Sequence, residues 1–179
     1  CAPVGGPGAT SSSCAPGWST DMRHSAGVMP CRVGHDGDLE VFLVHMGGPF
    51  WARKDEGAWS ITKGEYDPET EEPRATARRE FAEEVGRAVP EGQWVDLGET
   101  RHSGKVVTAY AVWATESLEW LRSNEIEIQW PPRSGRTMSI PEVDRGEWMS
   151  LERARERLVK GQRVFLDRLH PEKPPTYSR

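Results

Sequence analysis

A glutamate-rich segment, Gly64 to Arg87, constrains the fold and chemistry of this chain more than any other part of its sequence. It reads GEYDPETEEPRATARREFAEEVGR, and its second half is rich in Ala, Arg and Glu between a proline and a glycine. Proline suits the first turn of a helix and glycine the residue after the last turn. The segment therefore predicts a helix over Pro73–Gly86.

Three carboxylates share one face of this predicted helix. Glu80, Glu83 and Glu84 are spaced i, i+3 and i+4, and the side of the helix that can pack on a sheet carries Phe81, Ala82 and Val85. Like charges at this spacing repel, which favours a bound divalent cation such as Mg²⁺, an ion that prefers carboxylate oxygens. Charge spacing alone also fits a solvated surface helix held by Arg–Glu pairs.

The order of these residues resembles the signature of the Nudix hydrolases, Gx5Ex7REUxEExGU, in which U is apolar. The chain has Gly64, six residues, Glu71, seven residues, and then REFAEEVG from Arg79 to Gly86. The first spacer is one residue longer than in the signature, with Thr70 at the expected glutamate position, and a charged residue replaces the final apolar one. Because the extra residue precedes Pro73, we expect it to bulge in the loop and leave the helix intact.

The resemblance continues on both sides of the signature, over roughly Ser25 to Leu169. Ser25-Ala26-Gly27 opens the first strand as in many Nudix proteins, the run WSITKG before the helix is similar to the usual WSxPKG, and Glu142 precedes Trp148 as at the end of these domains. The resemblance implies an α/β/α sandwich. It also implies Mg²⁺-dependent hydrolysis of a nucleoside diphosphate linked to another group.

The resemblance further implies roles for individual residues. The carboxylates that would bind Mg²⁺, or Mn²⁺ as a substitute, belong to Glu80, Glu83 and Glu84, together with the carbonyl of Gly64. Glu84 and Glu142 are both candidates for the catalytic base. Independently of the resemblance, Arg79 beside Glu80 can hold a carboxylate in position by bidentate hydrogen bonds. Glu71, just before the helix start, is assigned a positioning role without a metal.

Substrate recognition must come from residues outside the signature. Lys63 and Arg53 could bind distal phosphates, although solvated loop cations are the alternative. Trp51, Trp59 and Tyr110 are the candidates for stacking on a base, although most tryptophans pack in cores. His45, at the end of a predicted strand, is assigned a structural role.

Around the helix, the pattern predicts strands, two hairpins and one or two C-terminal helices. The turn signatures Asp36-Gly37 and Ser103-Gly104 join the hairpin strands. Strands are predicted at 25–33, 39–45, 59–61, 93–102, 105–115 and 142–150, helices at 151–159 and 162–169, a loop at 64–72 and irregular structure at 117–140. This mixture predicts an α+β domain with a mixed sheet.

Composition limits the environment and the partners of the chain. It has 179 residues, a net charge of −5 and only three cysteines. No apolar stretch is long enough to span a bilayer, and the negative charge disfavours a nucleic-acid polymer as partner. The few cysteines lead us to expect a cytoplasmic protein, and the resemblance implies an enzyme with a small nucleotide as substrate, while the oligomeric state stays open.

We expect a flexible N-terminal tail at 1–21, rich in Gly, Ser, Pro and Ala, then a domain at 22–170 that resembles the Nudix hydrolase domain, and a short C-terminal tail at 171–179. Three functions fit the domain. The favoured one is hydrolysis of a dinucleoside polyphosphate such as diadenosine tetraphosphate. The alternatives are a MutT-like pyrophosphohydrolase that clears damaged nucleoside triphosphates and a non-catalytic Nudix-like module that only binds nucleotides.

Overall fold

The computed structural model describes residues 22–116 and 118–169, so both predicted tails lie outside the described residues. The strands are β1 Arg23–Val33, β2 Leu39–Met46, β3 Trp59–Ser60, β4 Thr62–Tyr66, β5 Trp94–His102, β6 Lys105–Trp113, β7 Glu125–Gln129, β8 Thr137–Pro141 and β9 Val143–Ser150. The helices are α1 Pro73–Val85, α2 Leu151–Arg157, the 3-10 turn η1 Lys160–Gln162 and α3 Arg163–Arg168. No helix among these residues is both long and apolar enough to traverse a bilayer.

Strand β1 is the centre of a seven-stranded mixed sheet. It runs parallel to β6 from Arg23 to Cys31, and β5 pairs antiparallel with the far edge of β6. Two strands share its other edge: β4 pairs with the first half of β1, and β2 pairs with the last three residues. Strands β3 and β9 pair with β2. The mixed sheet and the α+β class are thus as predicted.

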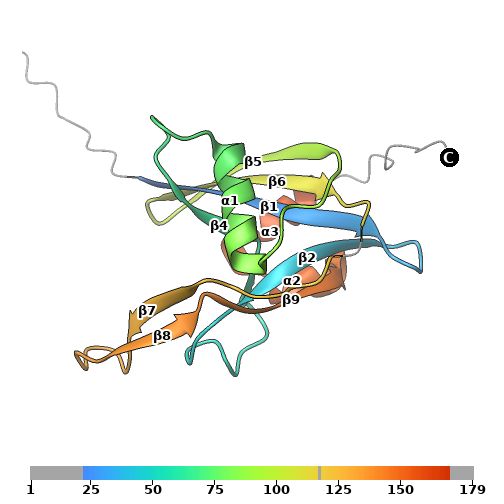
Figure 1. Ribbon diagram of the computed structural model, residues 1–179. Coiled ribbons are helices and arrows are strands. Elements are labelled where there is room, and N and C mark those ends of the chain that lie inside the picture. The colour runs from blue at the N-terminus through green and yellow to red at the C-terminus, as the bar shows by residue number, and fades with distance from the viewer. Residues whose placement is uncertain (1–21, 117, 170–179) are drawn as a thin grey trace, which may run out of the picture.

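Alternating side chains on the central strands build a core on each face of the sheet. Ala26 and Val28 of β1 pack with Phe81 and Val85 of α1 on one face. Met29 and Cys31 pack on the other face in a cluster that includes residues of α2 and α3. Since β-strand residues alternate between faces, a strand with two apolar faces belongs in the middle of a three-layer fold. Figure 1 shows α1 on one side of the sheet and α2 and α3 on the other.

Helix α1 begins and ends where its sequence predicts. Pro73 occupies the first turn, and Gly86 follows the last turn with a φ of 78°, a left-handed conformation that glycine adopts at little cost. The carboxylate of Glu72 caps the start by accepting a hydrogen bond from the Ala75 N–H at 2.7 Å. The extra residue before the helix is absorbed in a turn in which the N–H groups of Thr70 and Glu71 both donate to the Asp67 carbonyl.

Two sequence-based predictions of local structure are wrong. The segment after Gly64 is not all loop, because β4 continues to Tyr66. The stretch assigned irregular structure at 117–140 contains most of a two-stranded ribbon, β7–β8, which extends from the body of the domain in Figure 1. Its turn contains the two prolines and the Ser134-Gly135 pair that had predicted irregular structure. Both segments contribute residues to the site described next.

Candidate active site

The carboxylates of α1 differ in burial more than the helix pattern predicts. Glu80 is 8% exposed and Glu84 3% exposed, whereas Glu83 lies on the surface. Ala82, predicted to pack on the sheet, is exposed. Helix α1 therefore turns two carboxylates inward beside its apolar residues. A purely solvated helix face would leave all of them in water, so that alternative is wrong for Glu80 and Glu84.

Gly64 gives Glu80 the space it needs. The carboxylate of Glu80 fills the position that a side chain at Gly64 would take: an added Cβ would lie 1.8 Å from its carboxyl carbon. Strand β4 is held against β1 at this point by the pairing of Gly64 with Ala26. Any larger residue at position 64 would push Glu80 away, so the glycine is required for the close approach of backbone and carboxylate.

Burial and neighbouring negative charge disfavour the ionised form of Glu84. Desolvation by burial raises the pKa of Glu84 to about 8, and the charges of Glu142 and Glu80 add to this effect while Lys63 opposes it. The only hydrogen bond of the Glu84 carboxylate within the described residues comes from the Lys63 backbone N–H, at 3.3 Å. The pKa of Glu80 is also raised, mainly by burial, with Arg79 opposing. The site thus gathers mutually repelling carboxylates in a poorly solvated place.

Arg79 holds two of the carboxylates from the surface of α1. Its guanidinium forms an ion pair with Glu80 and lies 3.6 Å from the Glu83 carboxylate. This fits the predicted positioning role of Arg79. Glu71 lies on the surface of the turn before α1, and it lines the same open cleft as Arg79. The adjacent Glu72, which no sequence pattern had marked, is the residue that caps the start of α1.

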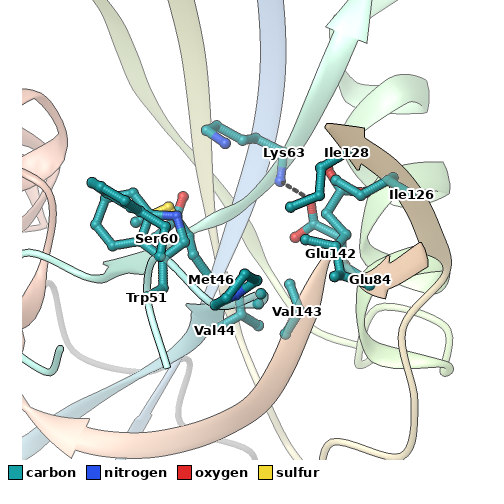
Figure 2. A pocket seen from close by; sticks show the side chains of 15 residues that line it. Val44, Met46, Trp51, Ser60, Lys63, Glu84, Ile126, Ile128, Glu142 and Val143 are labelled. Carbon is teal, nitrogen blue, oxygen red and sulfur yellow. Dashed lines mark hydrogen bonds between the residues drawn. The ribbon is translucent and has the colours of Figure 1, made fainter. Parts of the chain in front are cut away.

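Glu142 reaches the same region from the other end of the chain. It lies between β8 and β9, and Asn124 orients its carboxylate through a 2.9 Å hydrogen bond from Nδ2. Glu142 and Glu84 both line a pocket of about 280 Å³, shown in Figure 2. Residues far apart in sequence, predicted to supply alternative bases, are therefore brought together.

The rest of this pocket is mainly apolar. Its walls come from the loop after β2, from β9 and from the ribbon, and they include Phe50, Trp51, Val143, Ile126, Ile128 and Ile140. The register of β7 and β8 explains why the ribbon supplies apolar lining. Ile126 pairs with Ile140 and Ile128 with Met138, so one face of the ribbon is apolar. The alternation Glu-Ile-Glu-Ile at 125–128 is the sequence signal that could have identified this wall.

Of the predicted substrate-binding residues, some line the pocket and others do not. Trp51 lines the pocket as expected. Trp59 is fully buried, its indole N–H donating to Asp55, so the prediction that it stacks on a base is wrong. Tyr110 does not line this pocket; it packs edge to face against Trp94, beside the core cluster that includes residues of α1. Arg53 is an exposed loop residue that lines none of the described pockets.

Lys63 lines the pocket with its backbone rather than its ammonium group. Figure 2 shows its side chain pointing away from Glu84 and Glu142 while its N–H donates to Glu84. The predicted structural role of His45 is confirmed, because the buried ring lies 2.7 Å from the Asp144 carboxylate and 2.8 Å from the Lys54 carbonyl. His45 thereby ties the pocket loop to β9.

The donors around Gly64 fit a hard divalent cation. The carboxylates of Glu80 and Glu84 repel one another and have raised pKa values, a condition that a bound cation relieves. Over 22–116 and 118–169, no three His, Cys, Asp or Glu side chains are gathered closely enough to hold an ion as they stand. Glu80 and Glu83 face Arg79, so they must change rotamer to share an ion with Glu84.

Comparison with known proteins agrees with the class that this fold and site define. The NUDIX domain family profile matches residues 22–169, and the chain therefore belongs to the Nudix family. As predicted, it is a phosphoanhydride hydrolase by class, and the family generally uses divalent metal ions. A search of curated protein sequences found no significant match.

Solved structures show the same fold at low sequence identity. A Nudix hydrolase from M. smegmatis, RenU, is 20% identical with a TM-score of 0.53, and 83% of each chain is covered. The C. elegans Ap4A hydrolase in a binary complex is 17% identical with a TM-score of 0.50, covering 82% of this chain and 93% of that one. The C-terminal domain of mouse MUTYH, in complex with human PCNA, is 18% identical with a TM-score of 0.51, covering 80% and 84%.

Proposed function

We propose that this protein is a Mg²⁺-dependent hydrolase of nucleoside diphosphates linked to another group, and that a dinucleoside polyphosphate such as diadenosine tetraphosphate is its substrate. The observation that carries the proposal is the joint placement of Glu84 and Glu142 on one wall of a pocket whose other walls are apolar. A flat base can pack against Trp51 and the ribbon while the attached phosphates reach the carboxylates.

The carboxylates have separable roles in this proposal. Glu80, Glu83 and Glu84, with the Gly64 carbonyl, would hold the cation. When bound, the cation supplies charge neutralisation on the phosphate oxygens and activation of the attacking water. Glu142 takes the proton of that water. It suits this role because Asn124 fixes one of its oxygens while its side chain stays partly exposed to the pocket.

A second cleft supports a substrate with two nucleosides. It has a volume of about 470 Å³ and lies at the other end of β4, where its lining includes Arg23, His24, Tyr66, Glu71 and Arg79. His24 and Tyr66 meet edge to face with ring centroids 6.0 Å apart. Gly64 and Glu80 lie between Lys63 of the first pocket and Glu65 of the second cleft. A polyphosphate bridge over Gly64 could therefore place one base in each cleft.

Product analysis tests the proposed reaction. Diadenosine tetraphosphate, ATP and damaged deoxynucleoside triphosphates are incubated with Mg²⁺, and the products are separated by chromatography. We expect AMP and ATP from diadenosine tetraphosphate at the highest kcat/KM, with no turnover in EDTA. A preference for nucleoside triphosphates, yielding monophosphate and pyrophosphate, would favour the MutT-like alternative. Tight nucleotide binding without turnover would instead support the binding module.

A pair of variants tests the use of both clefts. Tyr66→Ala should raise the KM for diadenosine tetraphosphate while changing that for ATP little, because only the larger substrate reaches the second cleft. Trp51→Ala should raise both KM values, since either substrate places a base in the first pocket. Equal effects of Tyr66→Ala on the two substrates would contradict the assignment of the second nucleoside.

A further inference from the structure

A cavity on the opposite face of the sheet is not used by the proposed reaction. It has a volume of about 230 Å³ and lies under η1, the turn that precedes α3. Its lining comes from β4, β5, β6 and the segment around η1, and it consists of Lys63, Thr100, His102, Lys105, Val107, Val159, Gly161 and Gln162. Three of these side chains carry nitrogen groups that bind anions, and two are valines that offer an apolar wall.

The ammonium group of Lys63 belongs to this cavity. Lys63 adjoins Gly64, whose missing side chain faces Glu80, and neighbouring strand residues point to opposite faces. In Figure 2 the Lys63 side chain accordingly extends away from the active-site carboxylates. In the part of the chain that the structure describes, Lys63 has no ion-pair partner, whereas Lys105 is paired with Glu65 at 3.2 Å. Glu65 also lies 3.4 Å from Arg23, so this one carboxylate is shared by two cations.

A buried hydroxyl lies on the same sheet face, beside one residue of the cavity lining. Ser25 is 1% exposed, and its Oγ is the one buried side-chain polar atom of residues 22–116 and 118–169 without a hydrogen-bond partner. Ser25 pairs with Val107 on β6 and with Glu65 on β4. Directly paired residues share a face, so the hydroxyl lies on the same face as the floor of the cavity, next to a residue that lines it. A buried polar group without a partner is costly and calls for an explanation.

We propose that this cavity, defined by Lys63, His102, Lys105 and Val159, is a second binding site for a small phosphate-bearing molecule, separate from the carboxylate site. Phosphate oxygens accept charge-assisted hydrogen bonds from the two ammonium groups and a hydrogen bond from the Thr100 hydroxyl. The valines pack against the rest of the molecule. Because the Lys63 N–H also binds Glu84, the two sites meet at one residue of β4.

Titration without divalent cations separates this site from the active site. In EDTA the carboxylate cluster repels anions, so inorganic pyrophosphate should not bind there. We expect saturable binding of pyrophosphate to the full chain by isothermal titration calorimetry. In ¹H–¹⁵N spectra, the amide shifts should concentrate at Thr100, His102 and Gly161. No saturable binding, or shifts that concentrate at Trp51 and Glu142, would overturn the proposal.

Two matched lysine variants distinguish a built site from general attraction. Lys105→Gln removes an ammonium group from the cavity, and Lys160→Gln removes one from the exposed start of η1, outside the lining. Lys105→Gln should weaken pyrophosphate binding by roughly tenfold, and Lys160→Gln by less than about twofold. Equal weakening by both would show that only net charge attracts the anion. A normal melting temperature of Lys105→Gln confirms that the loss does not come from unfolding.

Discussion

The glutamates of α1 that would hold the cation are the residues on which activity should depend most. Glu84→Gln removes a charged oxygen from the proposed cation site, and Glu83→Gln removes another from its exposed side. Each should lower kcat by at least ~100-fold, because charge stabilisation of the transition state is lost. Steady-state assays at saturating Mg²⁺ measure this. Near wild-type turnover in either variant would contradict the site assignment.

Glu71→Gln is the matched control for these variants. Glu71 is exposed on the turn before the helix and is assigned no metal. Its substitution should reduce kcat far less than Glu83→Gln does. A loss as large as that of Glu83→Gln would mean that the loop register places Glu71 on the cation.

The raised pKa of Glu84 also predicts how stability changes with pH. The pKa of a glutamate in the unfolded chain is about 4.3, and the folded pKa is about 8. Between these values the folded protein binds more protons than the unfolded one, so stability falls as pH rises. Without divalent cations, the melting temperature should therefore decrease from pH 6 to pH 9. The Glu84→Gln variant should lose this part of the decrease; an unchanged pH profile in the variant would refute the account.

At the scale of elements, two neighbouring glutamates differ in their contribution to helix stability, because only one of them caps α1. The Glu72 carboxylate accepts the Ala75 N–H at the start of α1, and no such hydrogen bond is made by Glu71 among the described residues. Glu72→Ala should lower the free energy of unfolding by about 1 kcal/mol. Glu71→Ala should change it much less. Urea unfolding monitored by tryptophan fluorescence compares the two, and equal losses would contradict the capping assignment.

The β7–β8 ribbon should act on substrate binding rather than on the chemical step. Ile128 lines the first pocket, and Glu127 lies on the opposite face of the ribbon. Ile128→Ala removes apolar surface worth about 1.4 kcal/mol, which corresponds to a roughly tenfold rise in KM with kcat little changed. Glu127→Ala serves as the control on the polar face. A fall in kcat at unchanged KM would show that the ribbon does not contact the bound substrate.

Local sequence patterns predicted most elements. They failed where proline or glycine, which are typical of loops, belong to a strand or to the turn between two strands. The helix was predictable because Pro73 and Gly86 mark its ends, and the hairpins because Asp36-Gly37 and Ser103-Gly104 form turns. The ribbon was missed because its prolines join two strands instead of ending the pattern. Glycine at position 64 suggested a loop, whereas it makes room for Glu80 within a strand.

The site was predictable in its chemistry but not in its orientation. The spacing of the signature identifies Glu80 and Glu84, and Glu142 is found from its position before Trp148. No pattern along the chain shows that Trp59 is enclosed, or that the Lys63 ammonium group is on the other face of the sheet. The burial of Trp59 and the direction of the Lys63 side chain depend on the sheet face on which each residue lies, and strand pairing determines that face.

At the scale of the whole molecule, cation binding should couple to stability. A ligand that binds only the folded state stabilises it by about 2.7 kcal/mol at 100 times its dissociation constant. For a domain of this size, that is a rise in melting temperature of roughly 5–11 °C when Mg²⁺ replaces EDTA. Differential scanning fluorimetry measures the shift. The Glu84→Gln variant should lose most of it, and an equal shift in that variant would place the cation elsewhere.

The position of β1 has a consequence for how the chain reaches this state. The centre of the sheet forms only when β1 pairs with β6, and the paired residues of β6 are roughly 80 positions later in the chain. Pairings between such distant segments make folding slow, since a long loop must close before any contact compensates for its entropy. Glu80 meets Gly64 only when β4 is docked on β1. Affinity for a divalent cation should therefore arise late during folding, after the sheet has assembled.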